Sequence, residues 1–239
     1  MLISNCKFIL LKNIPIFTQL QLEEALLRND TQNWCLINTD VSPSIVLGIS
    51  GDPKELLFID HVKQDNIPII KRFSGGGTVF VEQSTIFITW IINNVPSLSI
   101  SPFAENILTW AKSLYQNVFP KNFLLKDNDY CILNKKIGGN ALYIQKNRWL
   151  LHSSFLWDFN SFLMNRYLKL PKQQPSYRQH RNHNDFLEKL NNFYNNKQNF
   201  IFSLESYLKN KFKMTEVPAE RILNIINSDH RKTTQLLSL

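Results

Sequence analysis

The amino-acid sequence predicts an α+β fold in which mixed, largely antiparallel sheets are flanked by helices. Segments rich in β-branched and aromatic residues interleave with segments of helical period, and no regular strand–helix–strand alternation runs through the chain. Between residues 123 and 156, short apolar segments follow one another with turn-sized gaps, as in an antiparallel sheet. The 239-residue chain is 44% hydrophobic and holds 17 Phe and 5 Trp, enough for one large core.

The first half of the chain holds two expected helices and several expected strands. The first helix covers 18–28, with Thr18 as its N-cap and with Glu23 and Glu24 favouring its first turns. The second helix covers 54–63 and has a proline at its N-terminus. Strands are expected at 34–38, 44–49, 67–72, 78–81 and 85–92.

The second half of the chain is predicted to form a helix over 102–117, the antiparallel segments, and then mostly helices. A hairpin turn is expected at Asn134-Lys135. The later helices are expected at 182–192, 203–212 and 218–226. We therefore predict a main domain over residues 1–190 and a short helical C-terminal tail over residues 191–239.

Composition and missing motifs exclude several classes of function. No run of about 18 apolar residues is present, so no membrane span is expected. Three widely spaced cysteines form no C-x-x-C pair, which argues against structural zinc and disulfides and favours a reducing, cytoplasmic compartment. The net charge of +8 comes without zinc-finger or RNA-recognition motifs, so nucleic acid is not expected; a positive surface can equally steer an acidic protein partner, and the alternative is that it serves solubility alone. The P-loop, G-x-G-x-x-G and G-x-S-x-G motifs are absent.

Five of the seven glycines form two clusters, Gly75 to Gly77 and Gly138-Gly139. Glycine lacks a Cβ, so a second backbone or a ligand can approach closely, and consecutive N–H groups can cradle an anion. A cation stands upstream of each cluster, Arg72 before the first and Lys136 before the second. This pattern indicates a phosphate or carboxylate ligand, and the alternative is a pair of tight turns.

Five segments carry a family resemblance when they are taken together. Two are R-F-S-G-G-G-T-V at 72–79 and K-I-G-G-N-A at 136–141. The others are Q-L-Q-L-E-E-A-L-L at 19–27, L-H-S-S-F-L at 151–156, and P-S-Y-R at 175–178 with Arg181, His183, Asp185 and Phe186. In order and spacing they resemble the glycine loop, lysine segment, first helix, H-H-G-x-L-L strand and P-x-Y-R run of the lipoate–protein ligase A family. The resemblance covers residues 14 to about 190 and implies a biotin/lipoate ligase-like catalytic domain.

The resemblance implies a two-step reaction that uses ATP, lipoate and Mg²⁺. The carboxylate of lipoate attacks the α-phosphate of ATP, and a lysine of an acceptor protein then attacks the lipoyl-adenylate. The implied acceptors are acidic lipoyl domains of 2-oxoacid dehydrogenase complexes or the glycine cleavage H protein. Whether lipoate or octanoate is the acyl donor stays open.

The resemblance also assigns residues to the site. Lys136 is the implied catalytic residue, because a compact ammonium suits a contact with both an acyl carbonyl and a phosphate oxygen. Asp129 is an implied Mg²⁺ ligand, with a plain turn residue as the alternative. For His152 the alternative is a hydrogen-bonded core histidine. The residues implied to bind ATP and lipoyl-adenylate are Arg72, Ser74, Gly75, Gly76, Gly77, Thr78, Val79, Phe80, Lys136, Gly139, Asn140, Ala141 and His152.

The chain departs from the family pattern in the loop, in one strand and in the tail. Phe73 stands where the family loop has a second arginine, and Leu151 and Ser153 replace a histidine and the glycine of the strand motif. Fewer than 50 residues follow Leu190, where many members carry an accessory domain. The tail is then a reduced cap, or a separate activating subunit is needed for adenylation.

Three other activities remain open. An ATP-independent octanoyl or lipoyl transferase commonly uses a cysteine nucleophile, and Cys131, the last cysteine of the chain, lies on an expected buried strand, which argues against that chemistry. Biotin ligation is the second alternative, and the G-R-G-R-x-x-R loop of biotin ligases is missing from this sequence. A non-catalytic binder of lipoyl domains would keep the fold and the basic surface.

Overall fold

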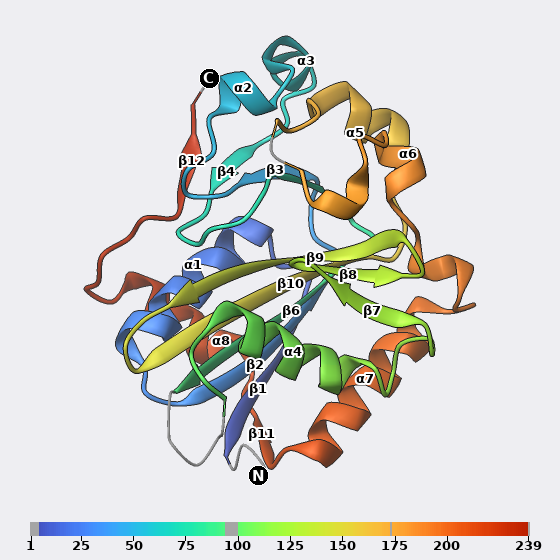
Figure 1. The fold of residues 1–239 in the computed structure, drawn as a ribbon. Helices are drawn as coiled ribbons and strands as arrows, with labels where there is room; N and C mark the ends of the chain where they lie inside the picture. Colours follow the sequence, from blue (N-terminus) through green and yellow to red (C-terminus); the bar gives the residue numbers. More distant parts are fainter. Residues whose placement is uncertain (1–4, 94–99, 173, 239) are drawn as a thin grey trace.

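The computed structural model describes residues 5–93, 100–172 and 174–238, whose strands form two sheets (Figure 1). The large sheet holds β1 (Cys6–Lys12), β2 (Asn33–Thr39), β6 (Thr85–Asn93), β7 (Phe123–Lys126), β8 (Asp129–Ile132), β9 (Lys135–Ile144), β10 (Arg148–Leu156) and β11 (Met214–Glu216). The small sheet holds β3 (Ser44–Leu47), β4 (Ile69–Lys71), β5 (Val79–Val81) and β12 (Gln235–Leu237). The α-helices are α1 (Ile16–Asn29), α2 (Pro53–Leu56), α3 (Ile59–Gln64), α4 (Ala104–Tyr115), α5 (Ser161–Tyr167), α6 (His183–Phe186), α7 (Lys197–Lys211) and α8 (Ala219–Ile222). The short 3-10 helices are η2 (Ser176–Arg178), η3 (Leu190–Asn192) and η4 (Leu223–Asn227).

Both sheets are mixed and mainly antiparallel. Their strand orders are β11-β1-β2-β6-β10-β9-β8-β7 and β12-β4-β3-β5. Parallel pairing joins β1 to β11, β1 to β2 and β3 to β4, and the other neighbours are antiparallel. The predicted α+β fold is confirmed.

Helices cover both faces of the large sheet (Figure 1). On one face α4 and α7 enclose an aromatic core around Trp90. On the other face α1 packs through Leu22 onto the large sheet and through Leu20 onto the small one, so it lies between the two sheets. The far side of the small sheet is covered by α3 and α5, through Val62 and Met164. None of the helices in the described ranges is long and apolar enough to cross a membrane.

Helix α1 begins two residues earlier than expected, at Ile16. Pro15 rather than Thr18 occupies the N-cap position, and no side chain caps this end. Proline is tolerated there because the N–H that it lacks would have no partner within the helix. Glu23 and Glu24 lie in the middle of the helix and are buried, so the expected Thr18 cap and acidic first turn are both wrong. Two buried carboxylates need partners, which the site and the C-terminal segment supply.

The single helix expected over 54–63 is instead two short helices. Leu57, between them, pairs with Leu168 in an antiparallel β-bridge, and the N–H of Phe58 donates to the carbonyl of Tyr167 at 2.9 Å. Extended backbone at this point interrupts the helical hydrogen bonds. A long-range pairing therefore overrides the local helical pattern.

The second glycine cluster lies inside a strand. The turn between β8 and β9 is at residues 133–134, and Lys135 already belongs to β9, which runs on through Gly138 and Gly139. A Cβ on Gly138 would lie 2.7 Å from the carbonyl oxygen of Ser154. The alternative of a tight turn at these glycines is therefore wrong, and the hairpin turn expected at Asn134-Lys135 lies one residue earlier.

The C-terminal tail contributes to both sheets. Strand β11 pairs with β1, and β12 pairs with β4. Helix α7 starts at Lys197, earlier than the expected 203, because the side chain of Asn196 caps it by accepting from the N–H of Asn199 at 3.0 Å. The tail therefore contains strands as well as helices. The domain boundary at residue 190 stays a prediction.

Candidate active site

The glycine loop, residues 73–78, is held from inside by Arg72. The guanidinium Nε and Nη2 donate to the carbonyl of Gly75 at 3.2 and 2.8 Å, and Nη2 also donates to the carbonyl of Gly77 at 2.9 Å. Arg72 is 5% exposed, and burial lowers its pKa to about 10, against the opposing charge of Glu23. The side chain thus fixes the shape of the loop, and its grip on an adenylate stays a prediction.

The glycine loop is pressed between β3 and β9. Gly76 has φ of +105°, and a Cβ on it would lie 2.6 Å from Arg72 Nη2 and 3.1 Å from the carbonyl oxygen of Asn140. A Cβ on Gly48 would lie only 2.1 Å from the carbonyl oxygen of Gly76. The fold therefore brings the two predicted glycine clusters together and adds Gly48, which the sequence motifs miss because it stands alone at the end of β3.

Lys136 projects beside the second glycine cluster. Its Nζ lies 2.8 Å from Oδ1 of Asp129, on the neighbouring strand β8. Asp129 is the register partner of Gly139, and a Cβ on Gly139 would lie 3.1 Å from the Lys136 Nζ. The missing side chain at Gly139 leaves the space that the ammonium uses.

The fit of a magnesium ion at Asp129 is poor in this structure. One carboxylate oxygen pairs with Lys136, and the other accepts from the hydroxyl of Tyr177 at 2.9 Å. Mg²⁺ needs open oxygen ligands, and no group of three or more potential metal-ligating side chains occurs in the part of the chain that the structure describes. No step of the chemistry is therefore assigned to a metal at Asp129, whose role as a ligand stays a prediction.

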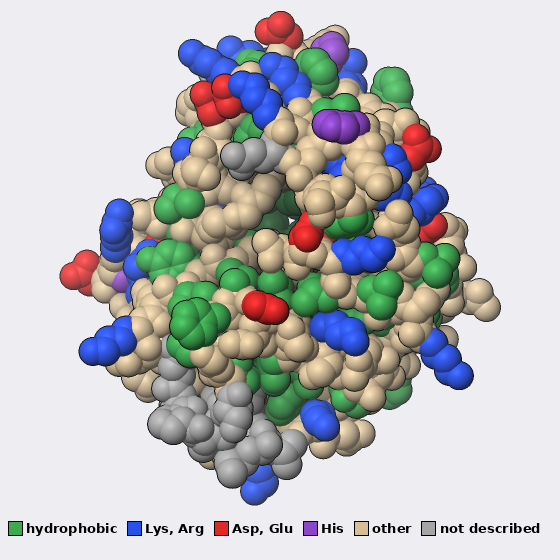
Figure 2. All heavy atoms as spheres, viewed as in Figure 1, with side chains coloured by type: hydrophobic (Ala, Val, Ile, Leu, Met, Phe, Trp, Pro, Cys, Tyr) green, Lys and Arg blue, Asp and Glu red, His purple; other side chains and the backbone are tan. Residues whose placement is uncertain are grey.

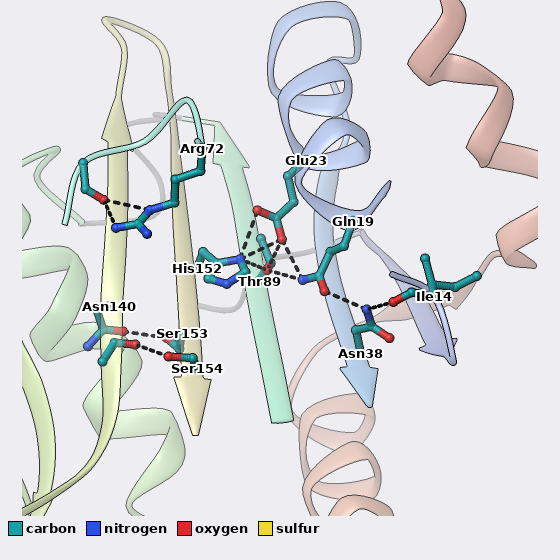
Figure 3. A network of polar contacts seen from close by, with 12 residues as sticks. Ile14, Gln19, Glu23, Asn38, Arg72, Thr89, Asn140, His152, Ser153 and Ser154 are labelled. Atoms are coloured by element: carbon teal, nitrogen blue, oxygen red, sulfur yellow. Dashed lines mark hydrogen bonds and ion pairs between the residues drawn. The ribbon is translucent and has the colours of Figure 1, made fainter. Parts of the chain in front are cut away.

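A buried polar network centred on Glu23 lies beside Arg72 (Figure 3). Its carboxylate, 0% exposed, lies 2.9 Å from His152 Nδ1 and accepts from Thr89 Oγ1 at 2.6 Å and Gln19 Nε2 at 2.7 Å. His152 is opposite Ala141 in β9 on one side and opposite Thr89 in β6 on the other, so the sheet register places it next to the lysine segment. This position is compatible with His152 as a ligand-binding residue and with His152 as a hydrogen-bonded core histidine.

Sequence reasoning missed Glu23, Thr89 and Gln19 as residues of this site. A usable signal exists for two of them. Gln19 and Glu23 are separated by four residues and interrupt the apolar side of α1 around Leu20. Polar residues four apart on a face that must be buried indicate a shared polar partner.

The remaining predicted site residues line the loop and the adjoining strands. The hydroxyls of Ser74 and Thr78 are buried and have no hydrogen-bond partner within the described ranges. The side chain of Asn140 accepts from Ser153 Oγ at 2.7 Å and donates to the carbonyl of Asn128. In β5, Val79 and Phe80 pair with Val46 and Ile45, and the Phe80 ring packs on Tyr167. Figure 2 shows the molecular surface hollowed between the small sheet and β9.

The fold matches solved lipoate–protein ligase structures. The structure superposes on a crystal structure of lipoate-protein ligase A bound with ATP with a TM-score of 0.76 and 14% sequence identity. The match covers 94% of this chain and 93% of the ligase chain. A bipartite lipoate protein ligase from Thermoplasma acidophilum gives a TM-score of 0.74 and 15% identity over 94% of this chain and 91% of that one. These similarities show a shared fold.

Residues 15–213 match the family model of the lipoyl protein ligase A/B catalytic domain, and the chain belongs to this family. It is 26% identical over 242 residues to a protein named inactive lipoate–protein ligase 2 of Plasmodium falciparum, covering 77% of this chain and 62% of the relative. It is 30% identical over 169 residues to a probable lipoate-protein ligase A of Mycoplasma pneumoniae, covering 67% of this chain and 48% of the relative. The chain thus spans less than two thirds of the length of these curated relatives.

Proposed function

We propose that this protein is a lipoate–protein ligase that activates lipoate with ATP and transfers the lipoyl group to a lysine of a lipoyl domain. The observation that carries the proposal is the meeting of the two glycine clusters. The arginine-braced loop lies against Asn140 and Ala141 of β9, and the ammonium of Lys136 lies over Gly139 of the same strand. Close backbone approach and a fixed cation suit a ligand that carries both a carboxylate and a phosphate.

In the first step a carboxylate oxygen of lipoate attacks the α-phosphorus of ATP. The bond to the β-phosphate oxygen breaks, and lipoyl-adenylate and pyrophosphate form, with Mg²⁺ bound to the ATP substrate. In the second step the neutral amine of the acceptor lysine attacks the acyl carbonyl, AMP leaves, and the new amide loses a proton. Lys136 would stabilise the charge on the carbonyl and phosphate oxygens in both steps, so no covalent enzyme intermediate is needed.

The cysteines argue against the alternative acyltransferase. All three are buried. Burial raises the pKa of Cys131, the cysteine beside the site, against the opposing effect of its contact with the Tyr177 hydroxyl at 3.3 Å. Burial raises the pKa of Cys6 to about 12 and that of Cys35 well above its usual value. A thiol that stays protonated is a poor nucleophile.

A non-catalytic binder of lipoyl domains is the second candidate. One relative carries the name inactive lipoate–protein ligase, and Phe73 stands where the family loop has an arginine. The Phe73 side chain is 1% exposed and packs on Tyr143, so it offers no charge to an adenylate. Such a protein would bind the acceptor without making the amide.

The proposed partners are acidic lipoyl domains, and the proposed compartment is the cytoplasm. The net charge of +8 favours association with an acidic domain. The Thermoplasma acidophilum relative is described as a bipartite ligase together with its E2 lipoyl domain. We extend both features to this chain as proposals: an E2-type or H-protein acceptor, and a separate activating subunit if the chain alone does not adenylate.

The test follows the mass of an isolated lipoyl domain incubated with the protein, ATP, Mg²⁺ and lipoate. The proposal predicts an ATP-dependent lipoyl mass gain that falls at least 100-fold in Lys136→Ala, the size of effect expected when a preorganised charge is removed. Lys135→Ala is the matched control, because Lys135 is the adjacent lysine of β9 and pairs with Glu188, 3.7 Å away.

Two further substrates separate the alternatives. A gain from supplied lipoyl-adenylate but not from ATP would place activation on another subunit. A gain only from octanoyl carrier protein would replace the ligase with a transferase. Binding of the lipoyl domain without any mass gain would leave the non-catalytic binder.

A further inference from the structure

The carboxylate of Asp129 joins Lys136 to a side chain from a distant part of the chain. Oδ1 pairs with the Lys136 Nζ at 2.8 Å, and Oδ2 accepts from the hydroxyl of Tyr177, in η2, at 2.9 Å. Asp129 is 8% exposed, so these two partners, rather than bulk water, determine how the carboxylate is oriented.

Tyr177 is itself fixed by its neighbours. Its carbonyl accepts from Arg181 Nη2 at 2.7 Å, and its ring packs on Phe186 with 5.3 Å between centroids. The N–H of Ser176 donates to Asp127 Oδ2 at 3.1 Å, which ties η2 to the turn between β7 and β8. The Tyr177 hydroxyl is the donor in its bond to Asp129, because a carboxylate oxygen can only accept.

The same segment also holds the backbone of Lys136. The N–H of Glu188 donates to the Lys136 carbonyl at 2.8 Å, and Leu187 forms a parallel β-bridge with Lys136. Residues 176–188 therefore contact Lys136 in two ways. They bond directly to its main chain, and they reach its ammonium group through the carboxylate of Asp129.

We propose that Tyr177 is a positioning residue for Lys136 and acts through Asp129. This inference rests on the proposed function, since it concerns how the Lys136 ammonium meets the adenylate. Without the Tyr177 hydroxyl, the carboxylate is free to rotate and the ammonium follows it away from Gly139. A misplacement of about 1 Å at a reacting centre can lower the rate by about 100-fold.

The experiment measures lipoylation kinetics, with ATP and lipoate as substrates, for Tyr177→Phe, Asp129→Asn and the double variant. Tyr177→Phe is expected to lower kcat by about 10- to 100-fold, with the KM for ATP and for lipoate changed by less than about twofold. The double variant is expected to be no slower than Asp129→Asn, because the tyrosine acts only through that carboxylate. If Tyr177 had only a structural role, the fold-losses in kcat of the two single variants would instead multiply in the double variant.

The chain offers a matched control in a second group in which a tyrosine and a cation share an aspartate, with arginine in place of lysine. The Tyr167 hydroxyl donates to Asp65 Oδ2 at 2.9 Å, and the same oxygen accepts from Arg166 Nε at 2.6 Å. Tyr167→Phe removes a similar hydrogen bond away from Lys136 and is expected to keep kcat within twofold, on the order of the scatter for independent sites.

The proposal is overturned if Tyr177→Phe keeps kcat within twofold of wild type, or if the Tyr177 and Asp129 effects multiply. Urea unfolding of the same three variants gives a readout that does not need activity. If the wild type is inactive with every acyl donor, the proposed function fails, and non-additive unfolding effects still support the Tyr177–Asp129 coupling. Additive unfolding effects would remove the coupling as well.

Discussion

Glu24 on helix α1 and Thr233 near the C-terminus, 209 residues apart, are joined through one carboxylate. Its two oxygens lie 3.0 and 3.1 Å from the Thr233 N–H, and Oε1 accepts from the Thr233 hydroxyl at 2.5 Å. The N–H of Thr234 and the guanidinium of Arg28 complete the set, at 2.9 and 3.0 Å. Because β12 follows directly and pairs with β4, this contact fixes the strand that leads into the glycine loop.

Glu24→Gln is expected to lower the free energy of unfolding by about 2–3 kcal/mol, because an amide cannot accept from all these buried donors. The control is Glu55→Gln, whose carboxylate is 59% exposed and pairs with Lys172 at 3.0 Å. The Glu55→Gln substitution should lower the free energy of unfolding by less than about 0.5 kcal/mol. Urea unfolding measures both variants, and equal losses would contradict a special role for Glu24.

His183 is expected to make stability fall in mildly acidic solution. Burial, and then the charges of Arg178 and Lys136, lower its pKa from 6.5 to about 4. The unfolded chain therefore takes up this proton near pH 6.5, whereas the folded chain resists it until about pH 4. The contribution to stability is complete above pH 6.5 and is lost progressively as the pH falls through this window to about 4.

The check compares wild type with His183→Gln at pH 7.5 and at pH 5. The variant lacks the titrating group, so its stability should fall less between the two pH values. Parallel slopes for the two proteins would sink this prediction.

Gly48→Ala is expected to displace the glycine loop. Its Cβ would lie 2.1 Å from the carbonyl oxygen of Gly76, a backbone atom, whereas a Cβ on Gly77 would meet nothing within 4 Å. We expect Gly48→Ala to lower the free energy of unfolding by about 1–3 kcal/mol and Gly77→Ala to lower it by less than about 0.5 kcal/mol. Thermal unfolding of both variants is the measurement, and a tolerant Gly48 would mean that the loop does not pack against β3.

Arg72→Lys is expected to loosen the glycine loop although the charge is kept. The lysine cannot reproduce the fork that binds the carbonyls of Gly75 and Gly77. Hydrogen exchange of the Ile49 amide, which donates to the Ser74 carbonyl of the loop at 3.1 Å, should accelerate by about 10- to 100-fold, as expected for a loss of roughly 1–3 kcal/mol of local stability. Lys71→Ala removes the neighbouring cation but none of these bonds, and it should leave the exchange rates unchanged.

Local patterns in the chain predict the regular elements well where the packing agrees with them. The strand expected at 85–92 becomes β6, and the helix expected over 102–117 becomes α4. The pattern fails at 54–63, where Leu57 pairs with Leu168, more than a hundred residues away. Helical period depends on neighbours within a few residues, and a β-bridge to a remote segment leaves no trace in it.

The sequence by itself determined the α+β class, the two glycine clusters with their cations, and the family resemblance that the family match confirms. Only the tertiary structure decided that Arg72 turns into its own loop, that Gly48 meets Gly76, and which partners surround the Glu23 carboxylate. The physical reason is distance along the chain. Strands and helices are joined by hydrogen bonds such as the one that the Glu23 carboxylate accepts from His152 Nδ1, 129 residues away. Only the register of the sheet brings such atoms within reach.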